Sequence, residues 1–470
     1  MTATLGRGPA ATWDADLAGL ADVRAKARAA REAARRLEGA DQETLDGYVR
    51  AMARTGTKAA EELARLAVDE TGYGVYEHKI YKNRYNTGFV ARWMLERRAV
   101  GVLWTDEAAR VTAIGSPMGV IAGIIPVTNP TSTALFKCLA AVTSGNAVVL
   151  APHPRAARCT ARAAEVMAEA AVAAGAPEGL VSCLDSPTLA ATAQLMSRDE
   201  IALVLATGGP GMVRAAYSSG KPTIAVGAGN VPAYVGASVA DPAEVAEMII
   251  TSKSFDNGTA CVAEQSVVVV DAVADAFLGA FAEHGAFWMD AAQQQALTAV
   301  LFDERGGLRP APVGQSARRL AELAGFAVPD ATRVLAAELD TVGAAIPLSR
   351  EILGPVLSVY RARDPQAGLA RCREILALGG EGHTVAVHAA DPDELAPFAA
   401  LPAGRIVVNT PALFGGMGYS TEVDPSFQLG TGTWSGSICS DNVTPLHLIN
   451  IKRVAHEVRP WRSVYDTVEV

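Results

Sequence analysis

The sequence is poor in cysteine, and its cysteines follow no recognisable pattern. Six are spread irregularly over 470 residues, and no Cys-x-x-Cys pair or histidine cluster has the spacing of metal ligands. We therefore expect neither a disulfide framework nor a metal site. Unpaired cysteines are typical of a reducing compartment, and we predict a cytoplasmic protein.

Long apolar runs and an excess of basic residues are also missing. The most apolar stretch, Val120–Val127, is far shorter than the roughly 20 residues of a membrane span. The first twenty residues contain Asp14 and Asp16, and they lack the apolar core of a secretory signal, so we expect none. The net charge of −9 argues against a general nucleic-acid binder. We therefore expect small-molecule partners, with no nucleic acid and no membrane.

Half of the residues are hydrophobic and 19% are charged, which is typical of a globular protein. The chain is too long for one core, so we expect two or three domains. Helical periodicity covers residues 17–37, Asp41 is placed to cap a second helix, and a third pattern over 57–69 ends near Gly72. The basic and aromatic segment Lys79–Arg84 fits a solvated helix face as well as a binding surface.

From Pro117 the sequence alternates between apolar strand-like runs and helical patterns. Strands separated by helices predict an α/β fold with a parallel sheet. The run Ile201–Leu205 leads into the turn Gly208–Gly211 and another helix. Such a turn presents backbone N–H groups to an anion, although a plain tight turn remains the alternative. The strands expected in this part are Val120–Ile125, Asn146–Leu150, Val181–Leu184 and Ile201–Leu205.

Two other parts of the chain also read as extended. Residues 99–114 resemble an isolated hairpin, which would pair with a distant part of the chain or with another subunit. Residues 266–430 form a second α/β unit, in which a Gly/Pro/Arg-rich loop covers about 303–315. The strands expected there are 266–270, 356–360, 384–388 and 405–408.

Cys261 differs from the other cysteines in its local sequence. It follows Asn257-Gly258, and both of these residues tolerate a positive φ, so Cys261 is expected on a turn and not in a helix. A thiol on a turn can face a cleft, although a buried structural cysteine is the alternative. The remaining cysteines lie in apparent helices, strands or the tail, where we interpret them as packing residues.

Several stretches together, in the same order, resemble the aldehyde dehydrogenase superfamily. Within it, the chain is most similar to the coenzyme-A-acylating branch, which includes the aldehyde dehydrogenase half of bifunctional aldehyde–alcohol dehydrogenases. The matching stretches are Thr128–Ser132, Pro152–Ala156, Ala206–Val213, Gly227–Asn230, the turn around Cys261, Glu351–Val356, Gly382–Thr384 and Asn409–Pro411.

The resemblance implies three parts. A Rossmann-like NAD(P)-binding domain would comprise residues 1–98 and 115–238. An α/β catalytic domain with the nucleophilic cysteine would cover 239–429. A small β oligomerisation element would combine 99–114 with 430–470 and build a homodimer or homotetramer.

The resemblance also implies roles for the catalytic residues. Cys261 would be the nucleophile, because a thiolate attacks a carbonyl to give a thiohemiacetal and, after loss of hydride, a thioester. The side-chain amide of Asn129 and the backbone N–H of Cys261 would bind the oxyanion. The alternative role of Asn129 is that of a turn residue before a proline. His383 is a candidate contact for the substrate or coenzyme A, and a core or loop histidine fits equally well.

The cofactor would be NAD, with NADP as an alternative. Gly208 and Gly209 would allow the pyrophosphate to approach the backbone, and Gly227 belongs to a second glycine turn on the cofactor side. His153 would contact the adenosine ribose, or else be a plain loop histidine. Glu351 would bind the nicotinamide ribose, or else be a charge on a turn.

The reaction implied is aldehyde + NAD(P)⁺ + CoA ⇌ acyl-CoA + NAD(P)H + H⁺. Hydrolytic relatives carry a glutamate as general base where this sequence has Ala225, and no acidic residue occurs between Glu200 and Asp241. The alternatives are a hydrolytic aldehyde dehydrogenase, a reductase of an acyl phosphate, and a catalytically silent scaffold. Small unbranched aldehydes are the default substrates, and sulfoacetaldehyde and succinate semialdehyde remain open.

Overall fold

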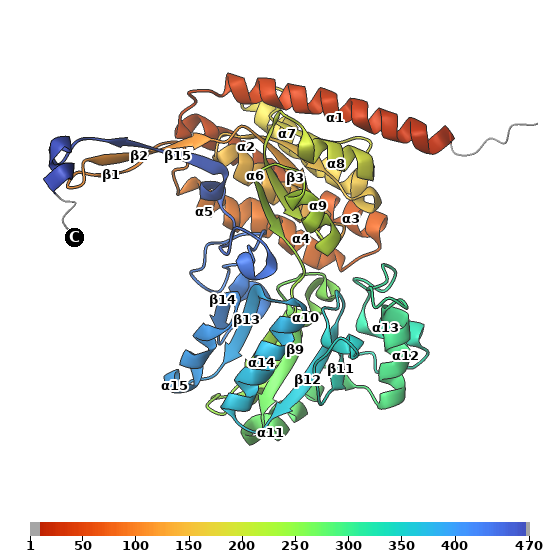
Figure 1. Ribbon diagram of the computed structural model, residues 1–470. Coiled ribbons are helices and arrows are strands. Elements are labelled where there is room, and N and C mark those ends of the chain that lie inside the picture. The colour runs from red at the N-terminus through yellow and green to blue at the C-terminus, as the bar shows by residue number, and fades with distance from the viewer. Residues whose placement is uncertain (1–9, 467–470) are drawn as a thin grey trace, which may run out of the picture.

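The computed structural model describes residues 10–466, so the parts of the predicted domains at 1–9 and 467–470 lie outside it. Figure 1 shows two α/β units, one above the other, and a narrow arm that projects to one side. The upper unit contains a five-stranded sheet, the lower unit a seven-stranded sheet, and the arm a three-stranded sheet. The predicted α/β class is therefore confirmed. Among the described helices, none combines the length and apolar composition that a bilayer crossing requires.

The upper sheet is parallel, with strand order β5-β4-β3-β6-β7. All residues of β3 and β4 are buried, as expected for strands covered by helices on both faces. The four predicted strands are present, and β7 is an addition at one edge. The bounds are β3 Val120–Ile124, β4 Ala147–Ala151, β5 Val181–Cys183, β6 Ile201–Thr207 and β7 Thr223–Val226.

The lower sheet is also parallel, with strand order β10-β11-β12-β9-β8-β13-β14. Because β8 belongs to this sheet, the two units divide between β7 and β8. The predicted boundary between the NAD(P)-binding domain and the catalytic domain, at residue 238, therefore lies too late in the chain. Strands β10 and β11 are not among the predicted strands: β10 has only three residues, and two of the five residues of β11 are alanine. The bounds are β8 Val231–Val235, β9 Glu264–Val270, β10 Ala286–Trp288, β11 Val334–Glu338, β12 Val356–Ala362, β13 Gly382–His388 and β14 Ala403–Val408.

Helix boundaries follow the signals in the sequence. The side chain of Asp41 accepts a hydrogen bond from the backbone N–H of Thr44 and caps α2, and Gly72, at φ 69°, ends α3. The helices of the upper unit are α1 Ala10–Arg36, α2 Gln42–Lys58, α3 Ala60–Thr71, α4 Tyr76–Arg84 with a π-helical turn Tyr85–Val90, α5 Ala91–Leu95, α6 Pro130–Thr143, α7 Ala157–Ala173, α8 Leu189–Ser197 and α9 Pro210–Tyr217.

The lower unit has shorter helices and one long loop. Residues 303–315 lie between α12 and α13 and form the predicted loop. The helices are α10 Pro242–Ser254, α11 Asp271–Glu283, α12 Ala291–Leu301, α13 Ala317–Ala324, α14 Pro365–Gly379, α15 Pro392–Leu395 and α16 Ala412–Gly416.

The arm is an antiparallel sheet of β1 (Gly101–Asp106), β2 (Val111–Pro117) and β15 (Ile449–Ala455). The predicted hairpin therefore pairs with a segment more than 300 residues away in the chain. The preceding tail is not part of the arm: Val443 and Leu448 are buried in the core of the upper unit.

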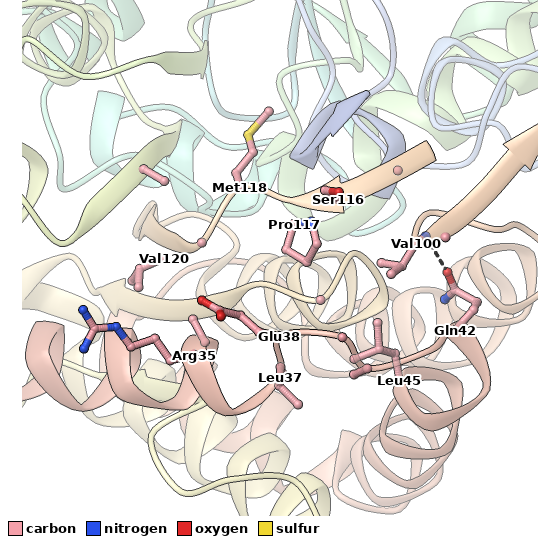
Figure 2. Close-up of a pocket in the computed structure, with 18 of the residues that line it drawn as sticks. Arg35, Leu37, Glu38, Gln42, Leu45, Val100, Ser116, Pro117, Met118 and Val120 are labelled. Carbon is pink, nitrogen blue, oxygen red and sulfur yellow. Dashed lines mark hydrogen bonds between the residues drawn. The ribbon is translucent and has the colours of Figure 1, made fainter. Parts of the chain in front are cut away.

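A groove of about 1140 Å³ lies at the base of the arm, between the end of α1 and the connection from β2 to β3 (Figure 2). The side-chain oxygen of Gln42 accepts hydrogen bonds from the backbone N–H groups of Ala99 and Val100, at 2.8 and 2.9 Å. Its amide nitrogen donates to Asp46 and to the carbonyl of Thr143. Gln42 therefore joins the start of α2 to the chain that enters the arm.

The tail is held closely against β13, and Gly382 makes this possible. Its φ is 84°, and a Cβ there would lie 1.6 Å from the carbonyl oxygen of Thr431.

We expect Gly382→Ala to lower the free energy of unfolding by about 2–4 kcal/mol, because backbone strain and overpacking add. Gly379→Ala is the control: it lies at the end of α14 with open space around it, so it should change stability by less than about 1 kcal/mol. Denaturant unfolding of both variants checks this, and equal stabilities would contradict it.

Candidate active site

A cleft of about 750 Å³ lies between the two units. Residues that follow β3, β4, β6 and β7 line one side, and residues that precede β9 and β12 line the other. In open parallel sheets, ligands bind outside the carboxyl ends of the strands, where the strand order reverses. That point lies between β3 and β6, because the chain continues from β3 to β4 and later returns to β6 on the other side.

Cys261 lies in this cleft, on the turn that the sequence predicts. Asp256, Asn257 and Gly258 have φ values of 50°, 52° and 67°, so the chain reverses sharply between α10 and β9. Cys261 follows this turn and is partly exposed, whereas the other five cysteines are buried. The prediction that those five are packing residues fits their burial.

Asn129 lies beside the same loop, at the N-terminus of α6. Its side-chain amide nitrogen donates to the carbonyl of Thr259 at 3.1 Å. The structure thus brings an amide donor to the cleft next to a thiol. The same nitrogen also donates to the hydroxyl of Thr128 at 3.3 Å. A carbonyl group that entered here could be attacked by the sulfur while its oxygen replaced this hydroxyl as the acceptor of the amide N–H.

Two lysines near this loop belong to the segment Lys79–Arg84, for which the sequence left a solvated helix face and a binding surface open. Lys79 and Lys82 are both 3% exposed, so the segment Lys79–Arg84 is not simply a solvated helix face. The ammonium group of Lys82 lies 2.6 Å from the side-chain oxygen of Asn129 and 2.6 Å from the carboxylate of Asp256. The one sequence signal for a shared buried partner is the spacing of Lys79 and Lys82: they are three residues apart, which places both on one face of α4.

Four of the residues predicted for the cofactor line the side of the cleft that belongs to the upper unit. Gly208 and Gly209 join β6 to α9, and a Cβ at Gly209 would meet no atom within 4 Å, so a ligand can approach the backbone there. Gly227 lies in the cleft after β7. His153 follows β4, and its Nδ1 accepts the backbone N–H of Arg155 at 3.1 Å. Burial and Arg155 lower the pKa of His153, so the ring is neutral and its Nε2–H can donate to a hydroxyl group.

Glu351 is the carboxylate of the cleft lining, and it accepts the backbone N–H of Gly229 at 2.9 Å. Burial raises the pKa of Glu351 to about 7. Burial and this carboxylate raise the pKa of Cys261 to about 12, whereas Arg405 and Lys82 act in the opposite direction. In the structure as it stands, Cys261 is therefore a protonated thiol at neutral pH.

His383 is fully buried at the start of β13 and is not among the residues that line the cleft. It packs behind the nucleophile loop: a Cβ at Gly229 would lie 2.4 Å from the carbonyl oxygen of Cys261 and 2.9 Å from the His383 ring. Burial and then Arg405 lower its pKa to about 3. The neutral ring supports the loop from behind, and its predicted contact with substrate or coenzyme A stays a prediction.

A further cluster contains Cys439, Asp441 and His447, whose ligand atoms lie within 4.8 Å of one another. The Nδ1 of His447 accepts the backbone N–H of Thr444 at 3.0 Å, which places the ring proton on Nε2, facing Asp441. A metal-binding histidine has the reverse arrangement, since its second nitrogen donates to the surroundings. The geometry fits a hydrogen-bonded cluster better than a metal site.

The effect of Glu351 on the thiol can be measured. Glu351→Gln removes a negative charge near Cys261, so more thiolate should form, and iodoacetamide alkylation at pH 8 should be about three- to tenfold faster for a pKa decrease of roughly 0.5–1 unit. Glu338→Gln, which changes an exposed carboxylate of β11 in the same unit, is the control. Peptide mapping should identify Cys261 as the labelled residue. An unchanged or slower rate in Glu351→Gln would contradict this assignment.

The chain is similar to several known proteins over most of its length. Residues 10–294 match the model of the aldehyde dehydrogenase family. The chain is 41% identical to the bifunctional aldehyde–alcohol dehydrogenase AdhE of Escherichia coli (strain K12) over 93% of this chain, but it spans about half (49%) of that relative. It is 39% identical to the sulfoacetaldehyde dehydrogenase (acylating) of Cupriavidus necator, covering 91% of this chain and 87% of the relative. The crystal structure of an acetylating aldehyde dehydrogenase from Geobacillus thermoglucosidasius has a TM-score of 0.93 at 42% identity and covers 95% of this chain and 98% of that one. The chain therefore belongs to the aldehyde dehydrogenase family.

Proposed function

We propose that the protein is a CoA-acylating aldehyde dehydrogenase that interconverts an aldehyde and its acyl-CoA. The observation that carries this proposal is the cleft in which the thiol of Cys261 lies beside the amide of Asn129, with Ala225 at the place of the general base of hydrolytic relatives. Ala225 is buried on β7 and cannot accept a proton. The names of the Cupriavidus and Geobacillus relatives, which specify acyl transfer, support the same assignment.

The residues of the chain then have distinct tasks. After its proton has passed to solvent, the sulfur of Cys261 bonds to the aldehyde carbon as the C=O π bond breaks, and the oxygen becomes an oxyanion held by Asn129 and the backbone N–H of Cys261. A nicotinamide, when bound, accepts the hydride that leaves this carbon. The resulting thioester on Cys261 is attacked by the CoA thiolate, which forms acyl-CoA and releases the cysteine. A thiolate needs far less base assistance than water, so the missing carboxylate at 225 favours CoA.

The cleft fits a nicotinamide dinucleotide. The open backbone at Gly209 begins α9, where the free N–H groups of a helix N-terminus favour a pyrophosphate. His153 and Glu351 lie at separate positions around the same cleft and offer a donor and an acceptor to ribose hydroxyl groups. We propose NAD as the cofactor, and the assay below compares it with NADP.

We further propose that the aldehyde is small and uncharged. The described residues that line the cleft include no lysine or arginine, and their one carboxylate is Glu351. A sulfonate or a second carboxylate on the substrate would therefore lose its hydration without a lysine or arginine of the lining to pair with it. All six cysteines are free thiols, which supports the cytoplasm as the location.

An assay of acyl transfer tests the function. With propionaldehyde and NAD⁺ or NADP⁺, we expect steady formation of reduced cofactor only when CoA is present, with propionyl-CoA as the product. Succinate semialdehyde should give a kcat/KM at least about tenfold lower, the size of roughly 1.4 kcal/mol of unfavourable desolvation. Cys261→Ala should abolish turnover. Propionic acid formed at a comparable rate without CoA would instead establish the hydrolytic alternative, and a wild-type protein inactive with every aldehyde would favour the scaffold.

We also propose that the arm lies at the interface of a homodimer or homotetramer. It exposes large apolar side chains in a part of the fold that has little core of its own: Val102, Trp104 and Val454 are 47%, 48% and 47% exposed. Its outer strands β1 and β15 each have a free edge within the described sheet. Exposed apolar surface and unpaired strand edges are both features that a subunit contact would cover.

Light scattering checks the assembly. Wild-type protein at micromolar concentration should have the mass of a dimer or tetramer, and Val454→Glu should shift it toward the monomer by placing a charge in the interface. Val172→Glu, on the exposed side of α7 (41% exposed), should keep the wild-type mass. A monomeric wild-type protein, or the same mass for all three proteins, would exclude the proposed interface.

A further inference from the structure

Three charged side chains are buried together beside the nucleophile loop. The carboxylate of Asp256 accepts hydrogen bonds from the ammonium groups of Lys79 (3.1 Å) and Lys82 (2.6 Å) and from the hydroxyl of Thr259 (2.7 Å). The two lysines belong to α4 in the upper unit, and Asp256 belongs to the turn before Cys261 in the lower unit. Burial alone would raise the pKa of Asp256, but Lys82 and Lys79 hold it at about 2, so the carboxylate is ionised.

Lys82 differs from Lys79 in its remaining contacts. It reaches three acceptors: the Asp256 carboxylate, the hydroxyl of Thr259 at 3.1 Å and the side-chain oxygen of Asn129 at 2.6 Å. Three acceptors require three protons on the nitrogen, so this geometry needs the ammonium form. Lys79 instead donates to Asp256 and to the backbone carbonyl of Thr128.

The contact with Lys82 determines which way the amide of Asn129 points. An ammonium group has no acceptor, so the Asn129 atom that faces it must be the oxygen. The amide nitrogen must then face the other way, toward Thr259 and the Cys261 loop. With a neutral apolar neighbour in place of Lys82, the flipped amide would also be allowed, and it would present an oxygen where a donor is needed.

We propose that Lys82 is a positioning residue of the oxyanion site, which fixes the amide of Asn129 as a donor toward the carbonyl oxygen and polarises it. A hydrogen bond from a cation to an amide oxygen withdraws electron density, so the N–H on the same group becomes a stronger donor. This inference rests on the proposed function, because it needs a tetrahedral oxyanion to form on Cys261.

The charge balance of the cluster supports this role. Two ammonium groups face one carboxylate, so the cluster carries one positive charge in excess, buried next to the nucleophile loop. An unbalanced buried cation is costly unless an anion compensates it. The oxyanion that develops during attack by Cys261 supplies such an anion at the Asn129 end of the network. Burial lowers the pKa of Lys82 to about 8 although Asp256 opposes this shift, which agrees with an incompletely compensated cation.

A purely structural ion cluster is the competing explanation, and Lys79 provides the matched control. Lys79→Met and Lys82→Met each remove one buried ammonium group from the same carboxylate oxygen. If the cluster only joins α4 to the loop, the two variants should lose similar stability and similar activity. If Lys82 positions Asn129, only Lys82→Met should lower kcat strongly, by about tenfold to a hundredfold with little change in the KM of the aldehyde, since losing a whole oxyanion donor costs roughly 10²–10³.

The experiment measures CoA-dependent aldehyde oxidation in five proteins: wild type, Lys79→Met, Lys82→Met, Asn129→Ala and the double variant Lys82→Met/Asn129→Ala. In the Asn129→Ala background, Lys82→Met should lower kcat by less than about threefold. The effects of two substitutions are not additive when one residue acts through the other. A full, multiplicative loss in the double variant, or equal losses of kcat in the two lysine variants, would overturn the proposal. A wild-type protein without activity would instead refute the function on which it rests.

Stability is measured in parallel by thermal unfolding. If Lys82→Met does not fold, the pair Lys82→Gln and Lys79→Gln replaces it, because glutamine keeps a polar group in the cluster. The amide introduced by Lys82→Gln can turn its own oxygen toward Asn129, so the kcat of this variant should again fall well below that of Lys79→Gln. Addition of methylammonium to Lys82→Ala should restore part of kcat in a concentration-dependent way. Equal kcat values for Lys82→Gln and Lys79→Gln, together with no rescue by methylammonium, would overturn the proposal.

Discussion

The carboxylate of Asp256 is the interaction on which the arrangement of the two units around the cleft depends. It belongs to the turn that carries Cys261, yet two of its partners are lysines from α4 of the other unit, and a third is the backbone N–H of Val75. Because a buried carboxylate is stable only with such partners, the turn can occupy its place only when the upper unit is folded against it. The thiol of Cys261 and the amide of Asn129, which the proposed function joins at one carbonyl group, are thereby held at a common site.

The parallel sheets explain why such a site arises between the units. The carboxyl ends of β3, β4, β6 and β7 face the amino ends of β9 and β12. One side of the cleft thus consists of loops that leave strands, which suit phosphate and ribose groups. The other side consists of loops that enter strands, where the turn before β9 presents Cys261. The glycine turns and Cys261 thus belong to different units and meet at the cleft.

The sequence predicted the features that depend on local chemistry. Asp41 as a helix cap, the positive φ before Cys261 and the Val/Ile-rich strands all depend on neighbouring residues, and the structure has them. Features that depend on distant contacts were missed: β8 joins the lower sheet, β11 is too rich in alanine to signal a strand, and the burial of Lys82 depends on Asp256, 174 residues away. The site residues were placed largely through the family resemblance, since no local pattern indicates that Glu351 or His153 faces the same cleft.

The segment between β14 and the arm has a consequence for how the protein is made. Gln428 and Leu429 line the cleft, and Arg405, on β14, donates to the backbone carbonyls of Gly430 and Ser440. Asn129, Cys261 and the glycine turns of the cleft are all synthesised before these residues. A nascent chain that ends at residue 400 therefore has the candidate site residues but lacks part of the cleft lining. The cleft can be complete only after synthesis has passed Ser440, so the thiol of Cys261 lacks part of its surroundings until then.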